Sequence, residues 1–210
     1  PGSKHILGKS YRDDGVSQGE AILVDLARHK KTAEFISYKL AQHLIADNPP
    51  GELVTAMRDT WIRTEGDLKA VITTMIRHPR SWQSEAQKYK TPREFVISAC
   101  RAVNDLDTVD EGMLDIALRG LGFMGQKPFG AGSPAGYSQL NRAWMGSDAL
   151  MKRIDWVNLL SKKTPATVSD VAERTFASQL SSRTAKSLAG AESRTQGLAM
   201  LLLSPEFLSR

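Results

Sequence analysis

Apolar residues recur at intervals of three and four along most of the chain, the spacing of one face of an amphipathic helix. Leu53, Met57 and Trp61 follow this spacing, as do Leu68 and Val71 with the residues after them. Runs of Val, Ile and Thr are short, and no segment alternates convincingly with a period of two. The pattern predicts an all-α fold: an irregular multi-helix domain of about nine to ten helices with a long central Gly/Pro-rich loop.

Capping residues and prolines place the ends of these helices. Asp67 is well placed to cap a helix, and Thr91 with Glu94 three residues later, around Pro92, gives the strongest start signal in the chain. The expected helices cover about 18–28, 32–46, 52–62, 68–76, 92–104, 110–118 (ending at Gly120), 147–163, 169–180, 182–188 and 190–203. A short amphipathic helical piece is expected over 81–88 and a last turn from Ser204.

The residues before the first expected helix show no helical pattern. Residues 1–3 (Pro-Gly-Ser) resemble the remnant of a cleaved purification tag, so we expect the natural chain to begin earlier. Residues 4–19 are polar and punctuated by glycine, which indicates an extended lead-in or a turn.

The segment GLGFMGQKPFGAGSPAGYSQLNRAW (120–144) interrupts the helical pattern. It holds six of the sixteen glycines and two of the nine prolines, a density typical of a structured loop. We therefore divide the chain into an N-terminal helical part (4–120), the loop (121–145) and a C-terminal helical part (146–210), with a single domain as the alternative. A loop of this length in a compact domain is usually functional or disordered.

Two interpretations of the loop remain open. In the first, it forms the rim of a binding site, with polar contacts from Gln126, Lys127 and Tyr137 and apolar walls from Phe129 and Trp144. In the second, which we favour, it is a packed crossover that covers the core between two helical parts.

No sequence motif gives convincing evidence of a catalytic or cofactor-binding site. Residues 120–125 match GxGxxG, but a helix precedes them and Met145 stands where the dinucleotide fingerprint requires an acid, so we treat the match as accidental. The chain contains no HExxH, GxSxG or Walker sequence. The sequence therefore identifies no catalytic residue and predicts no cofactor.

The histidine and acidic residues also give no clear metal or acid–base site. His29 and His43 each have an aspartate four residues away, Asp25 and Asp47, which is more simply a surface pair than a ligand pair. The acids at 105, 107, 110 and 111 do not fit a calcium loop and more simply cap a helix. The single cysteine, Cys100, has the spacing of a buried structural thiol. No metal site is predicted.

Composition is that of an ordinary globular protein, with 41% hydrophobic and 24% charged residues. No apolar run approaches the roughly 20 residues of a membrane span. The net charge of +5 is concentrated after residue 150, where nine basic residues face five acidic ones. These bases are scattered with few aromatic residues between them, which argues for solvated helix faces and against nucleic acid.

Several segments together resemble a known family. They are LGKSY (7–11), LARHKKTAEFISYKLAQHLIADNPP (26–50), GDLKAVITTMIRHPRSW (66–82), KTPREFVISACRAV (90–103), GQKPFGAGSPAGY (125–137), AWMGSDALMKR (143–153) and LLLSPEFLSR (201–210). In this order they resemble the C-terminal part of the bacterial family catalogued as domain of unknown function 1800.

The resemblance implies a predominantly helical protein, often exported or associated with the cell envelope, with a further helical half before the present chain. Such proteins are often encoded beside another uncharacterised family similar to phosphatases or sulfatases. The resemblance implies no established reaction. Ala131-Gly132-Ser133 departs from the family, which more often has a tryptophan-proline pair there.

Three functional hypotheses follow. The leading one is a non-catalytic interaction or scaffold module that contacts another protein through the loop, with an exposed apolar patch near Phe129, Tyr137 and Trp144. A second is a hydrolase completed by the missing half, with His29 or His43 facing the loop. A third is nucleic-acid binding, which requires one face to hold Lys152, Arg153, Lys162, Lys163, Arg183 and Lys186. Ligand, compartment and oligomeric state are left unknown.

Overall fold

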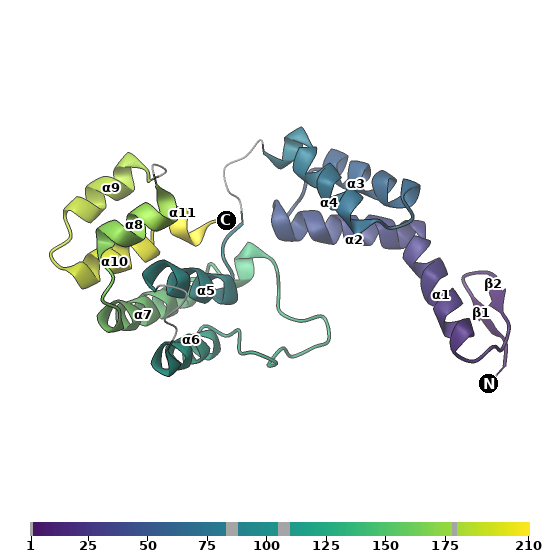
Figure 1. Ribbon diagram of the computed structural model, residues 1–210, viewed down its shortest axis with the longest axis horizontal. Helices are drawn as coiled ribbons and strands as arrows, with labels where there is room; N and C mark the ends of the chain where they lie inside the picture. The colour runs from purple at the N-terminus through teal and green to yellow at the C-terminus, as the bar shows by residue number, and fades with distance from the viewer. Residues whose placement is uncertain (1, 83–87, 105–109, 178–179) are drawn as a thin grey trace. The chain divides into compact units, whose positions relative to one another are not determined.

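The computed structural model describes residues 2–82, 88–104, 110–177 and 180–210, and most of its described residues lie in helices (Figure 1). Eleven α-helices and one two-stranded hairpin occur in these ranges, which confirms the all-α prediction. The chain forms two compact units, Pro1–Glu85 (unit 1) and Ala86–Arg210 (unit 2). The short helix predicted over 81–88 lies largely outside the described residues.

The elements of unit 1 are the strands β1 (Lys4–Ile6) and β2 (Lys9–Tyr11), the helices α1 (Val16–Arg28), α2 (Lys30–Leu44), α3 (Gly51–Arg63) and α4 (Leu68–Arg77), and the 3₁₀ turn η1 (Pro79–Ser81). Those of unit 2 are α5 (Pro92–Val103), α6 (Glu111–Phe123), the 3₁₀ turn η3 (Asn141–Ala143), α7 (Ser147–Lys163), α8 (Val168–Phe176), α9 (Ser182–Ala189), α10 (Arg194–Leu202) and α11 (Pro205–Leu208).

The polar lead-in forms an antiparallel hairpin that the alternation pattern did not indicate. Its two-residue turn, Leu7-Gly8, has positive φ at both positions, as a type I′ turn requires. Tyr11 donates a hydrogen bond of 2.7 Å to the carboxylate of Asp25 on α1, and Lys9 forms an ion pair with the same carboxylate. The hairpin is thus fastened to α1 by a long-range polar contact.

His29 separates α1 from α2. Its backbone is extended, and its Nδ1 accepts a hydrogen bond of 3.2 Å from the backbone N–H of Lys31. The second helix therefore begins at Lys30, two residues before the predicted start at Thr32, because an imidazole supplies the cap. Beyond this junction, α2, α3 and α4 enclose the core of unit 1.

Unit 2 has a larger core centred on Phe95. The Phe95 ring meets the ring of Trp156 edge-on with 5.7 Å between centroids, and that of Phe207 with 6.0 Å. Met113, on α6, precedes the Gly/Pro-rich loop and Trp156, on α7, follows it, yet both belong to this core. The loop therefore lies inside unit 2, and the boundary between the two compact units falls at Glu85–Ala86.

Helix α6 runs three residues beyond its predicted end at Gly120. A Cβ at Gly120 would lie 2.6 Å from Cδ1 of Trp156, and closer still to its Nε1, so this glycine permits close approach of α7. The helix ends at Phe123, and Gly125 follows with φ of 84°, the left-handed conformation common after helix C-termini. The GxGxxG match thus begins inside a helix, which agrees with its interpretation as accidental.

Candidate functional site

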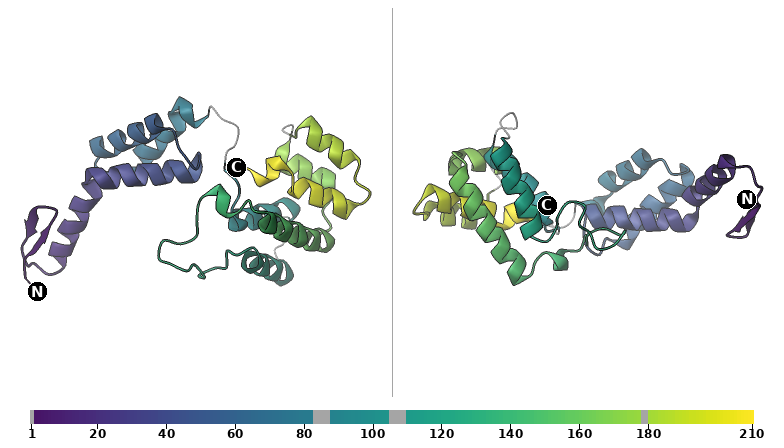
Figure 2. Two further views of the ribbon diagram at one scale, coloured as in Figure 1. Left: turned by 180° about the vertical axis from the view of Figure 1, so that it is seen from behind. Right: turned by 90° about the horizontal axis from the view of Figure 1, so that it is seen from below.

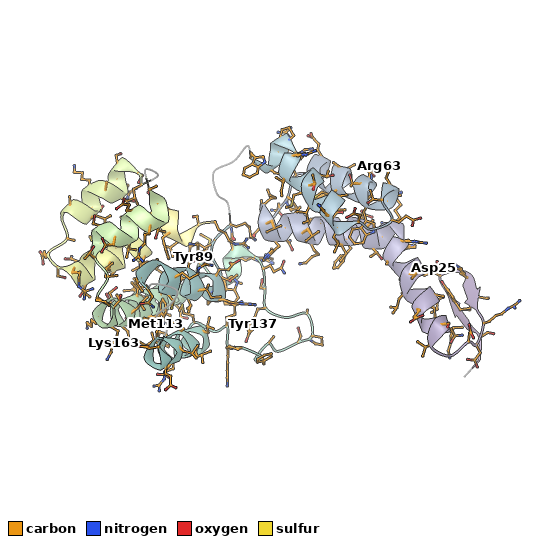
Figure 3. All side chains as sticks on the ribbon, in the orientation of Figure 1. Asp25, Arg63, Tyr89, Met113, Tyr137 and Lys163 are labelled. Carbon is orange, nitrogen blue, oxygen red and sulfur yellow. The ribbon has the colours of Figure 1, made fainter. Side chains whose placement is uncertain are left out.

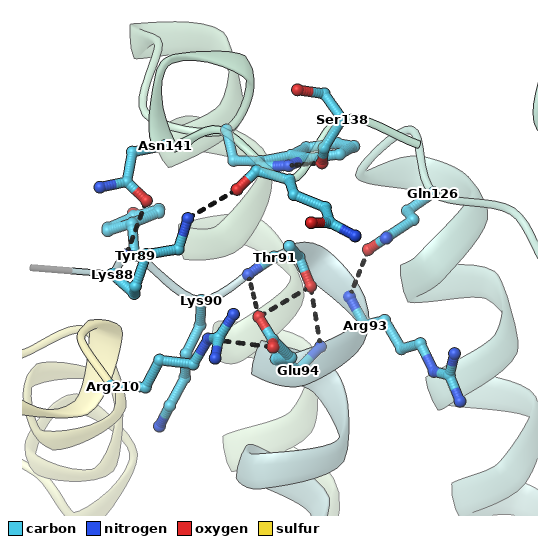
Figure 4. A network of polar contacts seen from close by, with 12 residues as sticks. Lys88, Tyr89, Lys90, Thr91, Arg93, Glu94, Gln126, Ser138, Asn141 and Arg210 are labelled. Atoms are coloured by element: carbon cyan, nitrogen blue, oxygen red, sulfur yellow. Dashed lines mark hydrogen bonds and ion pairs between the residues drawn. The ribbon is translucent and has the colours of Figure 1, made fainter. Parts of the chain in front are cut away.

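The Gly/Pro-rich loop leaves the end of α6, follows an extended course and returns to α7 (Figure 2). Its first anchor is Gln126, whose Oε1 accepts a hydrogen bond of 2.7 Å from the backbone N–H of Arg93 (Figure 4). Arg93 lies in the first turn of α5, where backbone N–H groups have no partner within the helix. Gln126 therefore ties the start of the loop to the start of α5.

The second anchor lies where the loop approaches α7. The ammonium group of Lys88 donates to the carbonyl of Gln139 at 2.7 Å, and Asn141 accepts from the backbone N–H of Tyr89 at 3.0 Å. Trp144 donates from its indole Nε1 to the carbonyl of Ser138 at 2.9 Å. These contacts hold the end of the loop against residues 88–89.

Residues 88–90 are in turn held by the last residues of the chain. The backbone N–H of Lys90 donates to the carbonyl of Leu208, and that of Arg210 donates to the carbonyl of Lys88, both at 2.8 Å. The side chain of Arg210 also forms an ion pair of 3.0 Å with Glu94 on α5. The frame that carries the loop is thus assembled from three segments far apart in the sequence.

Arg153 is buried beneath this frame. Its guanidinium donates to the carbonyl of Lys90 at 2.6 Å and lies 4.6 Å from the ring centroids of both Tyr89 and Phe95. Burial lowers the pKa of this guanidinium from its ordinary value. The side chain is 1% exposed, so the prediction that Arg153 belongs to a basic surface face is wrong. Its spacing with Trp156, Val157 and Leu160 was the signal that placed it on the buried face.

Residues 127–137, which we call the arm, lie between the two anchors. Tyr137, labelled in Figure 3, donates from its hydroxyl to the carbonyl of Lys127 at 2.8 Å and so closes the base of the arm. Its ring lies 6.4 Å from the ring of Trp144 at an angle of 58°. Trp144 is 8% exposed and thus part of the support, whereas Tyr137 is half-buried.

Phe129 is the third residue of the arm and faces solvent. Its side chain has a relative exposure of 109%, and its φ is 56°, a conformation that residues other than glycine rarely adopt. Lys127 is also exposed. The structure therefore brings the five predicted loop residues together in two groups: Gln126, Tyr137 and Trp144 hold the loop in place, while Lys127 and Phe129 face solvent.

The other candidate residues have ordinary structural surroundings. His29 and His43 belong to α2 and its cap in unit 1, whereas the loop belongs to unit 2. Burial raises the pKa of the Cys100 thiol to about 11, so the half-buried thiol is protonated near neutral pH. Asp110 caps α6 by accepting from the backbone N–H of Met113 at 2.7 Å; Asp105 and Asp107 lie outside the described residues.

Metal-binding clusters and membrane-spanning helices would each narrow the class of protein. Within the described ranges, no cluster of three or more His, Cys, Asp or Glu side chains could hold a metal ion. None of the described helices has the length and apolar character needed to cross a bilayer.

The fold and the loop define a class: an all-α protein whose described residues present an anchored arm with an exposed aromatic ring. The chain belongs to the family described as "Protein of unknown function (DUF1800)", whose family model matches residues 1–209. This confirms the family predicted from the quoted segments. No curated protein and no solved structure matched the chain.

Proposed function

We propose that this chain is a non-catalytic interaction module of a larger protein, and that the arm contacts another protein through Phe129. The observation that carries the proposal is the full exposure of this ring within the arm. Burying a phenylalanine side chain is worth roughly 1.5–3 kcal/mol, so a partner pocket that receives the ring gains a comparable contribution. Aromatic anchors of this kind often dominate protein interfaces.

The anchored base of the arm supports the same function. Gln126 holds one end, Trp144 holds the other, and Tyr137 joins the two sides. A segment that is already ordered loses less conformational entropy when it binds than a free loop does. The positive φ of Phe129 costs roughly 1–2 kcal/mol, and the ordered base of the arm holds the residue in this conformation.

Charge indicates the character of the partner surface. Lys127 is the sole charged residue of the arm and lies two residues from Phe129. We therefore expect an apolar pocket with a carboxylate at its edge. Charge at the edge of an interface mainly changes the association rate and its salt dependence.

The test is photo-crosslinking in cells that make the protein naturally. A photoreactive phenylalanine analogue replaces Phe129 in one variant and Phe35, on α2 of unit 1, in the control; Phe35 is 61% exposed. We expect a discrete adduct from position 129 that is absent from position 35. Equal adducts at both positions, or none at 129, would contradict the proposal.

The partner identified in this way then allows an affinity measurement. Phe129→Ala should weaken its binding by about tenfold or more, which corresponds to roughly 1.4 kcal/mol. The free energy of unfolding should change by no more than about 0.5 kcal/mol, because the ring has no packing to lose. A loss of binding accompanied by a loss of stability would indicate that the variant is misfolded.

A further inference from the structure

A second surface feature of unit 2 does not involve the arm. It is a cleft of about 370 Å³ between α5 and the end of α8, with Lys90 and α11 at its side. Its lining residues, here called the basic cleft, are Lys90, Ile97, Ser98, Arg101, Ala102, Arg174, Thr175 and Phe207. The volume lies within the range of small-molecule sites.

Charge in the basic cleft is unbalanced. Three lining residues are cationic, none is a carboxylate, and Ser98 and Thr175 add hydroxyl groups. Among the residues that the structure describes, no carboxylate lies within ion-pair distance of Lys90, Arg101 or Arg174. Three positive charges that share one cleft repel each other, and an anion placed among them relieves that repulsion.

Lys90 shows this imbalance most directly. Its ammonium lies 4.1 Å from the centroid of the Phe207 ring, which offers a weaker interaction than a carboxylate. Glu94, in the first turn of α5, attracts Lys90, which precedes that helix. The Glu94 carboxylate, however, already binds Arg210 and the backbone N–H of Thr91. Burial, assisted by repulsion from Arg153, lowers the pKa of Lys90 to about 8 despite Glu94.

We propose that the basic cleft binds a phosphate monoester that carries a small apolar group. Arg101 on α5 and Arg174 on α8 supply two guanidinium groups, whose planar donors match the oxygens of phosphate. The ammonium of Lys90 and the hydroxyls of Ser98 and Thr175 supply further donors. A dianion balances the three cations better than a monocarboxylate does.

The basic cleft also offers apolar surface to the apolar group of the ligand. Ile97 is 45% exposed beside the cations, and the buried ring of Phe207 contributes to the same lining. An inorganic phosphate leaves this surface in contact with water. An aromatic or aliphatic phosphate monoester covers it and should bind more tightly.

Calorimetric titration of the whole chain with phenyl phosphate tests the proposal. We expect saturable binding that weakens with added salt, tighter than that of inorganic phosphate or of phenylacetate, which keeps the ring but carries one charge. Arg101→Gln and Arg174→Gln should each reduce the affinity by about tenfold or more. Arg183→Gln, which changes an exposed residue of α9 outside the lining, should leave it within about twofold.

Vesicles of phosphatidylcholine with and without phosphatidic acid distinguish a lipid headgroup from a soluble ligand. Retention on the phosphatidic acid vesicles that Arg101→Gln abolishes would support the cleft with a lipid as the source of the phosphate monoester. The proposal is overturned if phenyl phosphate does not bind at millimolar concentration and the vesicles do not retain the chain. It is also overturned if phenylacetate binds as well as phenyl phosphate, or if both cleft variants bind normally while far-UV circular dichroism shows them folded.

The proposals for the basic cleft and for the arm can be tested independently of each other. No residue of 127–137 lines the cleft, so Phe129→Ala should leave phenyl phosphate binding unchanged. Conversely, Arg101→Gln should leave the crosslinked adduct at position 129 intact. The proposed interaction through Phe129 therefore does not depend on the outcome of the phosphate titration.

Discussion

At the scale of one residue, Gly120 shows how a missing side chain allows two helices to pack closely. Where its neighbour Trp156 crosses α6, the indole Nε1 donates to the carbonyl of Ile116 at 3.0 Å. A methyl group at position 120 would occupy the space of that indole. The glycine is therefore required by packing between helices, although glycine inside a helix costs stability on its own.

Gly120→Ala should destabilise the protein by about 1–3 kcal/mol, because the indole must move and its hydrogen bond with Ile116 weakens. Urea unfolding followed by circular dichroism measures the change. Gly122→Ala is the matched control in the same helix: a Cβ there has nothing within 4 Å. Alanine should be neutral or stabilising at 122, by up to roughly 1 kcal/mol. Equal losses in both variants would show that contact with Trp156 does not set the effect, because helix propensity alone favours alanine at both positions.

Glu206 is a second residue whose properties come from distant partners. Its carboxylate accepts from the hydroxyl of Thr184 at 2.9 Å and from the backbone N–H of Ser181 at 3.2 Å. Partial burial acts against the ionised form, but the hydrogen bonds from Ser181 and Thr184, with those from backbone N–H groups, outweigh it and lower the pKa of Glu206 to about 2.

A lowered pKa makes stability depend on pH in a defined window. The contribution of Glu206 is fully present above the pKa of the unfolded chain, ordinarily 4.5, and is lost as the pH falls towards about 2. Glu206→Gln should therefore lower stability at neutral pH and flatten the acid dependence between these values. Acid titration of the unfolding free energy checks this, with Glu173→Gln as an exposed control that should follow the unchanged protein.

Helix α5 is the element on which the site depends. Thr91 and Glu94 form a complete capping box: the carboxylate accepts from the Thr91 backbone N–H at 2.8 Å, and the Thr91 hydroxyl accepts from the Glu94 backbone N–H at 3.4 Å. The next free N–H, that of Arg93, is satisfied by Gln126. The start of α5 thus fixes the loop as well as itself.

Thr91→Ala removes the hydroxyl half of the capping box and should cost about 1 kcal/mol of stability. Thr91→Ser keeps the oxygen and should retain most of it. Thermal unfolding of the two variants measures the difference. Identical melting temperatures for alanine and serine would show that the cap contributes nothing, in spite of its complete geometry.

Two compact units set the behaviour of the whole molecule. Among the described residues, the core of unit 1 consists of seven buried apolar side chains, and that of unit 2 consists of eighteen. Small cores leave little net stability after the cost of conformational entropy. The units should accordingly differ in their resistance to unfolding.

Residues 2–82 and 88–210, produced separately, should each fold, and the larger piece should melt at the higher temperature. Differential scanning calorimetry of both pieces and of the whole chain checks this, with two transitions expected in the whole chain. Tryptophan fluorescence assigns them, because Trp61 and Trp82 report on unit 1 and Trp144 and Trp156 on unit 2. An unfolded piece 88–210 would contradict the independence of unit 2.

Local signals were enough to predict the helices. The apolar spacing, the Asp67 cap and the Thr91–Glu94 capping box involve residues within one or two turns, and the structure confirms each of them. The His29 cap, the Leu7-Gly8 hairpin and the continuation of α6 past Gly120 were missed. The His29 cap uses an unusual capping group. The hairpin strands are only three residues long, too short for an alternation pattern to stand out. Gly120 packs against Trp156, which comes from a later helix.

By itself the sequence determined the all-α class, the family and the position of the loop, because helix periodicity and glycine and proline content are properties of neighbouring residues. Tertiary structure decided which loop residues support the arm and which face solvent. It also buried Arg153 against Tyr89 and Phe95 and gathered Lys90, Arg101 and Arg174 around one cleft. These outcomes depend on contacts between α5, α7, α8 and the last residues, and such contacts exist only once the core around Phe95 has formed.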